Sequence, residues 1–117
     1  ALAIAMDSAG YQIDSRGRVT EAALYAPSTD ILAARLAQPD AVRGWSDLYR
    51  NSYVTYTGDG GKTYRVWYED ARSVSEKMKL AAMFGVNGLS LWRVGLIPTA
   101  VDPSLDYDVW SAIQARR

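Results

Sequence analysis

Two adjacent carboxylates, Glu69 and Asp70, follow an aromatic segment that ends at Tyr68 and precede an amphipathic stretch. A carboxylate at this place can accept a hydrogen bond from a substrate hydroxyl or orient a neighbouring group. The interpretation we favour is that Asp70 stabilises the start of a helix through its macrodipole, or pairs with Arg72 or Arg93. Neighbouring residues of one strand point to opposite faces, so this pair alone does not form an acid/base couple.

Trp92 ends a short apolar run and is followed by Arg93 and Gly95, which predicts a position near the rim of a sheet. Pyranose rings have apolar faces that stack on indole, so Trp92 is a candidate sugar platform. Tyr68 belongs to a Tyr-rich hairpin that either faces a carbohydrate or only makes cross-strand aromatic pairs. The members of that hairpin are Tyr53, Tyr56, Tyr64 and Tyr68. The indoles that we interpret as packing residues are Trp45, Trp67 and Trp110.

The composition excludes several classes of function. The 117 residues contain no His and no Cys, which removes imidazole bases, thiol nucleophiles and ordinary zinc sites, so we expect no metal and no cofactor. Thirteen basic and thirteen acidic residues cancel, leaving no electrostatic footprint for nucleic acid or an anionic membrane. No apolar run is long enough to span a bilayer. At this length the chain is one domain at most.

The opening apolar run has no basic segment before it, so it does not read as a signal peptide. We expect instead a chain cut from a larger protein within a buried strand. The first half then shows a strand over 2–6, a hairpin over 11–20 turning at Gly17, and a helix capped by Ser28. Helical spacing of three apolar residues predicts a short helix or turn over 40–51; they are Trp45, Leu48 and Tyr49.

The second half has clearer signals. Strands over 53–56 and 63–68 flank the glycine-rich segment 58–61, the strongest hairpin signal in the chain. Ser73 and Glu76 have the spacing of a capping box, which predicts a helix that ends at Gly85. The core-facing side chains predicted for this helix are Val74, Met78, Ala81, Ala82 and Phe84, and those predicted outside are Glu76, Lys77 and Lys79. A strand over 88–92 and a terminal helix over 106–115 complete the α/β pattern.

The aromatic hairpin, the segment VWYEDARS over 66–73 and the segment GVNGLSLWRVG over 85–95 resemble glycoside hydrolase family 18, the chitinase-like barrels. They are most similar to the bacterial branch that includes spore-cortex and peptidoglycan N-acetylglucosaminidases. The resemblance is good over residues 45–97 and weaker over 2–14. It implies the C-terminal segment of a TIM (β/α)8 barrel with a small inserted α+β subdomain, or an α+β piece when isolated.

On this resemblance, residues 1–10 are a barrel strand, 11–66 the inserted subdomain, and 67–117 the last helix-strand-helix. Trp92 is then the floor of the subsite for the sugar to be cleaved, with Tyr68, Glu69 and Asp70 as further substrate-binding candidates. The family's catalytic motif, D-x-x-D-x-D-x-E, is absent from this sequence. The resemblance therefore implies no catalytic residue here, and we expect the chain alone to be inactive.

The leading hypothesis is the C-terminal region of a glycosidase acting on N-acetylglucosamine polymers, chitin or peptidoglycan. This substrate class implies an extracellular or cell-wall location. The expected partners are such a polysaccharide and the remainder of the parent barrel, or a second copy joined through exposed strand edges. The alternative is a non-catalytic carbohydrate-binding or structural module, which the Trp and Tyr positions also allow.

Overall fold

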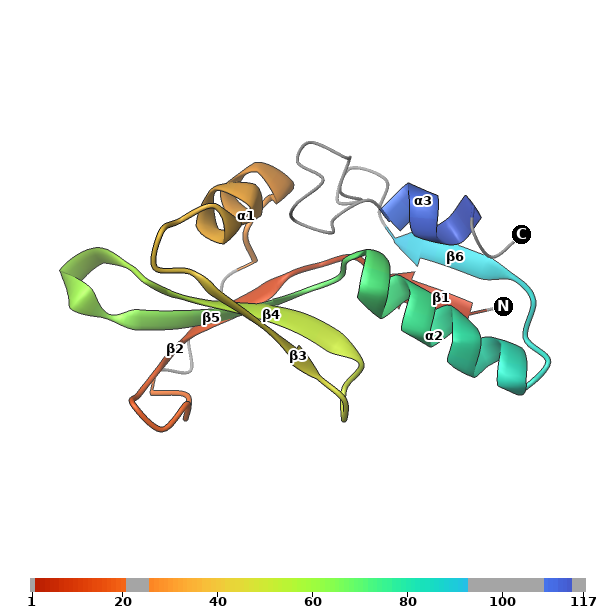
Figure 1. Ribbon diagram of the computed structural model, residues 1–117, viewed down its shortest axis with the longest axis horizontal. Helices are drawn as coiled ribbons and strands as arrows, with labels where there is room; N and C mark the ends of the chain where they lie inside the picture. Colours follow the sequence, from red (N-terminus) through yellow and green to blue (C-terminus); the bar gives the residue numbers. More distant parts are fainter. Residues whose placement is uncertain (1, 21–25, 93–108, 115–117) are drawn as a thin grey trace.

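A computed structural model describes residues 2–20, 26–92 and 109–114, which form two sheets and three helices (Figure 1). The strands are β1 (Leu2–Ala5), β2 (Ala9–Ile13), β3 (Val42–Ser46), β4 (Asn51–Thr57), β5 (Thr63–Tyr68) and β6 (Leu89–Trp92). The helices are α1 (Thr29–Leu36), α2 (Ala71–Met83) and α3 (Val109–Gln114), with a short 3₁₀ turn, η1 (Asp59–Gly61). This is a mixed α/β structure, and its described residues do not include a complete barrel.

The smaller sheet is a parallel pair of β1 and β6, in which Leu2 is opposite Leu89 and Ala5 opposite Trp92. Parallel pairing of these distant segments confirms the arrangement that the α/β pattern predicts. Helices α2 and α3 contact each other beside the pair, and a small core joins them. The buried members of that core are Ile4, Met6, Val74 and Val109. The carboxyl ends of both strands are directed toward the other sheet (Figure 1).

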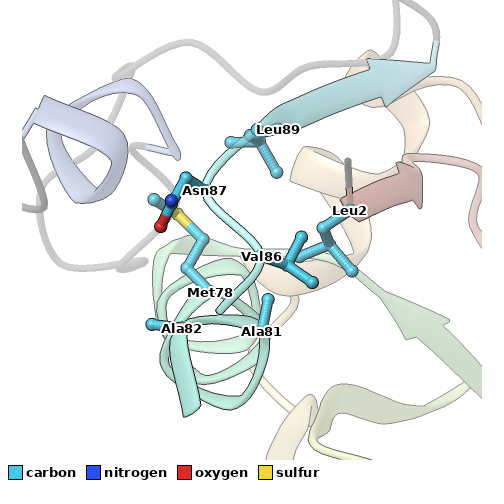
Figure 2. A pocket seen from close by; sticks show the side chains of 8 residues that line it. Leu2, Met78, Ala81, Ala82, Val86, Asn87 and Leu89 are labelled. Atoms are coloured by element: carbon cyan, nitrogen blue, oxygen red, sulfur yellow. The ribbon is translucent and has the colours of Figure 1, made fainter. Parts of the chain in front are cut away.

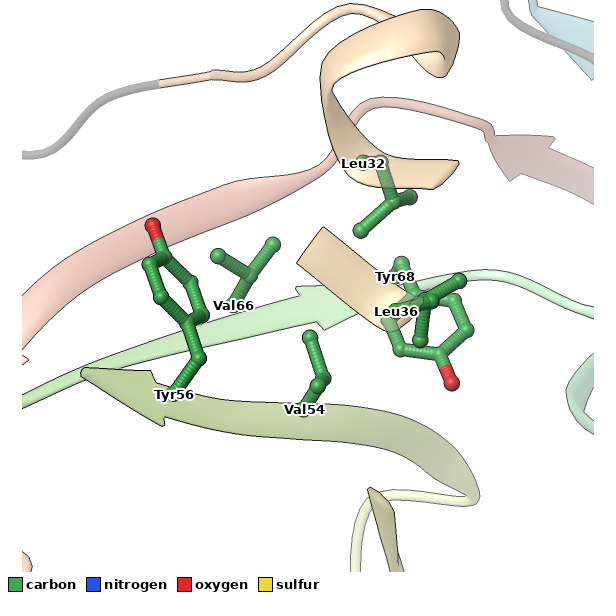
Figure 3. Packing of buried hydrophobic residues seen from close by; sticks show 6 residues of the cluster. All are labelled: Leu32, Leu36, Val54, Tyr56, Val66 and Tyr68. Carbon is green, nitrogen blue, oxygen red and sulfur yellow. The ribbon is translucent and has the colours of Figure 1, made fainter. Parts of the chain in front are cut away.

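The larger sheet is antiparallel, with the order β2-β5-β4-β3. Alternate residues of β4 and β5 face helix α1, which covers one side of the sheet and forms the second core (Figure 3). The buried members of that core are Leu32, Leu36, Val54, Tyr56, Val66 and Tyr68. Ser28 accepts a hydrogen bond from the Ile31 amide, so the predicted cap of α1 is confirmed.

Both predicted hairpin turns are confirmed. Gly60 and Gly61 have φ of 72° and 73°, and the Gly58 amide donates to Lys62 O at 2.8 Å, which closes the turn between β4 and β5. Gly17 has φ of 78°, in the turn where Asp14 Oδ1 accepts from two backbone amides. In the sequence, the larger sheet begins with β2 at Ala9 and ends with β5 at Tyr68. The resemblance implies an inserted subdomain over 11–66, so the sheet begins two residues earlier and ends two residues later than that subdomain.

The helix predicted over residues 40–51 is wrong, and the turn predicted as its alternative occupies residues 47–50. Val42–Ser46 is an edge strand, β3, that pairs antiparallel with β4 and places Trp45 opposite Ser52. Gly44 favours this pairing because the Tyr53 ring covers its backbone, where a Cβ atom would lie only 2.3 Å from that ring. The helical spacing of Trp45, Leu48 and Tyr49 therefore arises from a strand followed by a tight turn.

Helix α2 ends as predicted, because Gly85 has φ of 74° and its amide donates to Ala82 O. The core-facing assignment of Phe84 is wrong, since its side chain is 78% exposed beyond the last turn. The terminal helix is confirmed over Val109–Gln114 with Val109 buried. The rest of the predicted range, 106–108 and 115, lies outside the described residues, as does the side chain of Trp110.

Asp40 connects the segment after α1 to the end of β4. Its carboxylate accepts from the Thr57 amide at 2.9 Å and from Gln38 Nε2 at 3.0 Å, and these bonds lower the pKa of Asp40 below its ordinary 3.8. A lowered pKa stabilises the fold above pH 3.8, and this stabilisation is lost as the pH falls through the folded-state value.

The contribution of Asp40 is tested with Asp40→Asn, which has no titrating group at this position. As the pH is lowered from about 5 to about 2, the free energy of unfolding should fall less for this variant than for the parent chain, in urea unfolding measured across that range. Parallel curves for the two proteins would contradict this.

Candidate functional site

A cleft of about 230 Å³ lies where the larger sheet meets the start of α2. Its walls come from β3, from β4 and from the residues that connect β5 directly to α2. The lining residues are Arg43, Gly44, Trp45, Ser52, Tyr68, Asp70 and Arg72. Two of the four predicted substrate-binding residues, Tyr68 and Asp70, are thus brought together in one concave surface.

Asp70 is the N-cap of α2 and is only 5% exposed. Its Oδ1 accepts from the Ser73 amide at 2.8 Å, and Ser73 Oγ in turn accepts from the Asp70 amide at 2.8 Å. The second carboxylate oxygen accepts from Ser52 Oγ at 2.5 Å. The capping box is therefore formed by Asp70 and Ser73, so the box predicted from Ser73 and Glu76 is wrong by one turn. The favoured interpretation of Asp70, a helix-start residue, is confirmed.

Glu69 is buried behind the cleft in a network that connects α2 to β4. Its Oε2 accepts from Ser73 Oγ at 2.6 Å, and its Oε1 forms an ion pair with Lys77. Lys77 Nζ also donates to Asn51 Oδ1 at 2.5 Å. The outside position predicted for Lys77 is therefore wrong, because its side chain points inward to Glu69 and Asn51. Both carboxylates contact Ser73, so the expectation that they point to opposite faces is wrong, because β5 ends at Tyr68 and neither residue lies in the strand.

Arg72 and Trp45 form the outer part of the cleft. The Arg72 guanidinium carbon lies 4.1 Å from the centre of the Trp45 ring, a cation–π contact. The indole is held in turn by a 3.0 Å hydrogen bond from its Nε1 to Asp47. This pair presents a guanidinium in a defined place beside Asp70.

The predicted tyrosine wall is divided between the two faces of the sheet. Tyr56, Tyr64 and Tyr68 lie on the side of α1, and Figure 3 shows Tyr56 and Tyr68 among the core residues. Tyr53 lies on the opposite side, where its ring packs against Trp67 with centroids 4.8 Å apart. Trp67 also donates from Nε1 to the Tyr11 hydroxyl, so the packing role predicted for Trp67 is confirmed. Only Tyr68 combines a core position with a place in the cleft.

Trp92 stands apart from the cleft. It ends β6, its carbonyl accepts from the Met6 amide at 2.6 Å, and its side chain is 65% exposed. It lines neither the cleft nor a second cavity of about 150 Å³ at the amino ends of β1 and β6. Figure 2 shows that second cavity, lined by Leu2, Met78, Ala81, Ala82, Val86, Asn87, Gly88 and Leu89. Most of its lining side chains are apolar, and Asn87 is the polar one.

Five cleft residues were not predicted from the sequence as site residues: Arg43, Gly44, Trp45, Ser52 and Arg72. Trp45 was assigned to packing, and Arg72 was considered only as a partner for Asp70. In residues 2–20, 26–92 and 109–114, no three acidic side chains gather where they could hold a metal ion. Within the same ranges, no helix has the length and apolarity needed to cross a bilayer.

Comparison with known proteins gives relatives of one kind, although no protein-family model matches the chain. A 44-residue segment is 39% identical to the cortical fragment-lytic enzyme of Bacillus anthracis and covers 38% of this chain but 10% of that enzyme. A chitinase from Chromobacterium violaceum superposes on 96% of this chain and 31% of its own, with a TM-score of 0.69 and 21% identity. A family 18 N-acetylglucosaminidase from Paenibacillus barengoltzii superposes on 97% of this chain and 32% of its own, with a TM-score of 0.66 and 18% identity.

The chain thus spans about a tenth of the curated relative and about a third of each solved structure. At these identities the solved structures show a shared fold. The relatives of this chain are chitinase-like enzymes of glycoside hydrolase family 18 and spore cortex-lytic enzymes, which confirms that the chain resembles a part of such an enzyme.

Proposed function

We propose that this chain is the C-terminal region of a family 18-type glycosidase that acts on N-acetylglucosamine polymers, chitin or peptidoglycan. In this proposal it is the last segment of a TIM (β/α)8 barrel, with 1–10 as a strand, 11–66 as an inserted subdomain and 67–117 as the final helix-strand-helix. It contributes sugar binding and lacks the catalytic acid, so it does not cleave the polymer alone.

The observation that carries the proposal is the parallel pair β1–β6, whose carboxyl ends adjoin the cleft-bearing sheet (Figure 1). Parallel α/β barrels place their working residues at the carboxyl ends of strands. Trp92 ends β6 on this side, and its large exposed indole supports a role as a stacking platform. Tyr68, Asp70 and Glu69 follow as further substrate-binding residues, and Glu69 is connected to Asp70 through Ser73.

The unpaired edges of β1 and β6 favour a partner that pairs with these strands. Among the described strands, β1 pairs only with β6 and β6 only with β1, and an unpaired strand edge is a template for further pairing. We propose that the remainder of the parent barrel covers these edges, and that a second copy of the chain does so when the chain is isolated. The substrate class supports an extracellular or cell-wall location.

The test is a titration of the chain with N-acetylglucosamine oligomers, followed by indole fluorescence and amide NMR shifts. Trp92→Ala is expected to weaken binding about five- to tenfold, because it removes the stacking surface. The fold should persist, since this side chain is mostly exposed. No release of sugar from chitin or peptidoglycan is expected from either protein.

Phe84→Ala is the matched control, because Phe84 is also an exposed aromatic residue and lies at the C-terminal end of α2, away from Trp92 at the end of β6. It should leave sugar affinity unchanged. Hydrolysis by the chain, or equal binding by the Trp92→Ala variant, would refute the corresponding part of the proposal. Absence of any sugar binding by the folded chain would favour a structural module instead.

A further inference from the structure

The parallel pair β1–β6 has two different sides. Helices α2 and α3 pack against one side, where Ile4 is buried. The side chains that alternate with this core point to the opposite side and are exposed, and we call that side the open face. Its members are Ala3 and Ala5 from β1 and Ser90 and Trp92 from β6. Three of the four are small, so the indole at the carboxyl end is the one large ring on this face.

Asp7 extends the open face beyond the end of β1. The Met6 amide donates to Trp92 O at 2.6 Å, so the pairing of the two segments continues past Ala5, the residue opposite Trp92. Asp7 is exposed, and the buried side chains that alternate with it are Ile4, Met6 and Ser8. This alternation places Asp7 on the side of Ala5, about 7 Å farther along the strand. One sugar ring lying on the Trp92 indole can span that separation.

The Asp7 carboxylate has no structural task within residues 2–20, 26–92 and 109–114, where it takes part in no hydrogen bond and no ion pair. Four other aspartates accept hydrogen bonds that hold turns, strands or a helix start: Asp14, Asp40, Asp47 and Asp70. Asp7 differs from them in having both oxygens available. An ionised carboxylate is an acceptor only, so a ligand for Asp7 must bring donors.

A sugar stacked on Trp92 brings such donors. The apolar face of a pyranose covers the indole, and its hydroxyl groups then point outward around the edge of the ring. We propose that Asp7 is a sugar-binding residue that accepts hydrogen bonds from hydroxyls of the ring stacked on Trp92. Stacking alone leaves the ring free to turn on the indole, whereas a carboxylate at one edge fixes its orientation. This inference rests on the proposed function and adds the polar contact that orients the sugar.

The first test is a titration of the chain with the methyl β-glycoside of N-acetylglucosamine and with its oligomers, followed by amide NMR shifts. Asp7→Ala should weaken binding about tenfold, because a hydrogen bond to a charged group is lost. Asp7→Asn should weaken it less, since a neutral amide oxygen is a weaker acceptor. Glu76→Gln is the matched control, because it also removes one negative charge but from a surface pair with Lys79 that lines neither cavity. It should leave the affinity unchanged.

The second test identifies the hydroxyl, with monodeoxy forms of the same glycoside that each lack one hydroxyl. The parent chain should bind one of these forms about tenfold less tightly than the complete sugar, and Asp7→Ala should bind the two equally. A role of Asp7 in the fold alone would not produce this difference. If Asp7→Ala failed to fold, the same comparison with Asp7→Asn, which keeps the shape of the side chain, would decide.

The outcomes separate this inference from the proposed function. Binding that is lost in Trp92→Ala but unchanged in both Asp7 variants would overturn the role of Asp7 alone. The same would follow if every deoxy form lost equal affinity for the parent chain and for Asp7→Ala. Absence of sugar binding by the folded parent chain would overturn the proposed sugar binding, and the role of Asp7 with it.

Discussion

Leu32→Ala is expected to destabilise the chain by about 2–4 kcal/mol. Leu32 is 2% exposed and comes from α1, the one described helix in the core of the larger sheet. The substitution removes the transfer free energy of the lost atoms and leaves a cavity against Val54 and Val66 that the sheet cannot close. Urea unfolding measured by circular dichroism and indole fluorescence would give the change in free energy.

Ile31→Ala is the control for Leu32→Ala. Ile31 is the neighbouring residue of α1, but its side chain is 48% exposed. It should cost less than about 1 kcal/mol, since surface substitutions usually have small effects. If the two variants unfolded at the same urea concentration, α1 would not be packed on the sheet as described.

Lys77→Met is the second substitution with a large expected effect, about 2–4 kcal/mol. It keeps the length of the side chain but removes the cation that pairs with the Glu69 carboxylate, which is 8% exposed. It also removes the hydrogen bond to Asn51. A buried carboxylate without its partner retains the cost of desolvation, so the connection between α2 and β4 should weaken.

The Lys77 prediction is checked by a double-mutant cycle with Glu69→Gln. Removing both charges should cost less than the sum of the single substitutions, because no unpaired charge is then left behind. Lys79→Met supplies a control, since Lys79 pairs with Glu76 at the exposed surface of the same helix. Additive effects of Lys77→Met and Glu69→Gln would mean that the ion pair is not formed in solution.

The strands with strong local signals were predictable from the sequence. The glycines between β4 and β5 need positive φ, and alternating aromatic and β-branched residues flank them, so turn and strands indicate the same hairpin. Edge strand β3 was not predictable in this way. Its residues combine with the following turn to imitate helical spacing, and only the pairing with β4 decides the structure.

The error in β3 also hid the cleft. Tyr68 and Asp70 were identified because strand and helix signals surround them, but the opposite wall comes from Arg43 and Trp45 of β3. A helix at 40–51 gives no reason to place those two residues beside Arg72.

The parallel pairing of β1 with β6 has a consequence for synthesis on the ribosome. β1 is translated before the larger sheet, and its only partner among the described strands, β6, is made after that sheet. Until then the edge of β1 that pairs with β6 has unpaired backbone N–H and C=O groups, while the local β4–β5 hairpin can form early. The pairing also closes a long loop, which makes it a slow step in folding. The nascent chain is therefore most prone to aggregate through β1, and a chaperone that covers this strand would protect it until β6 emerges.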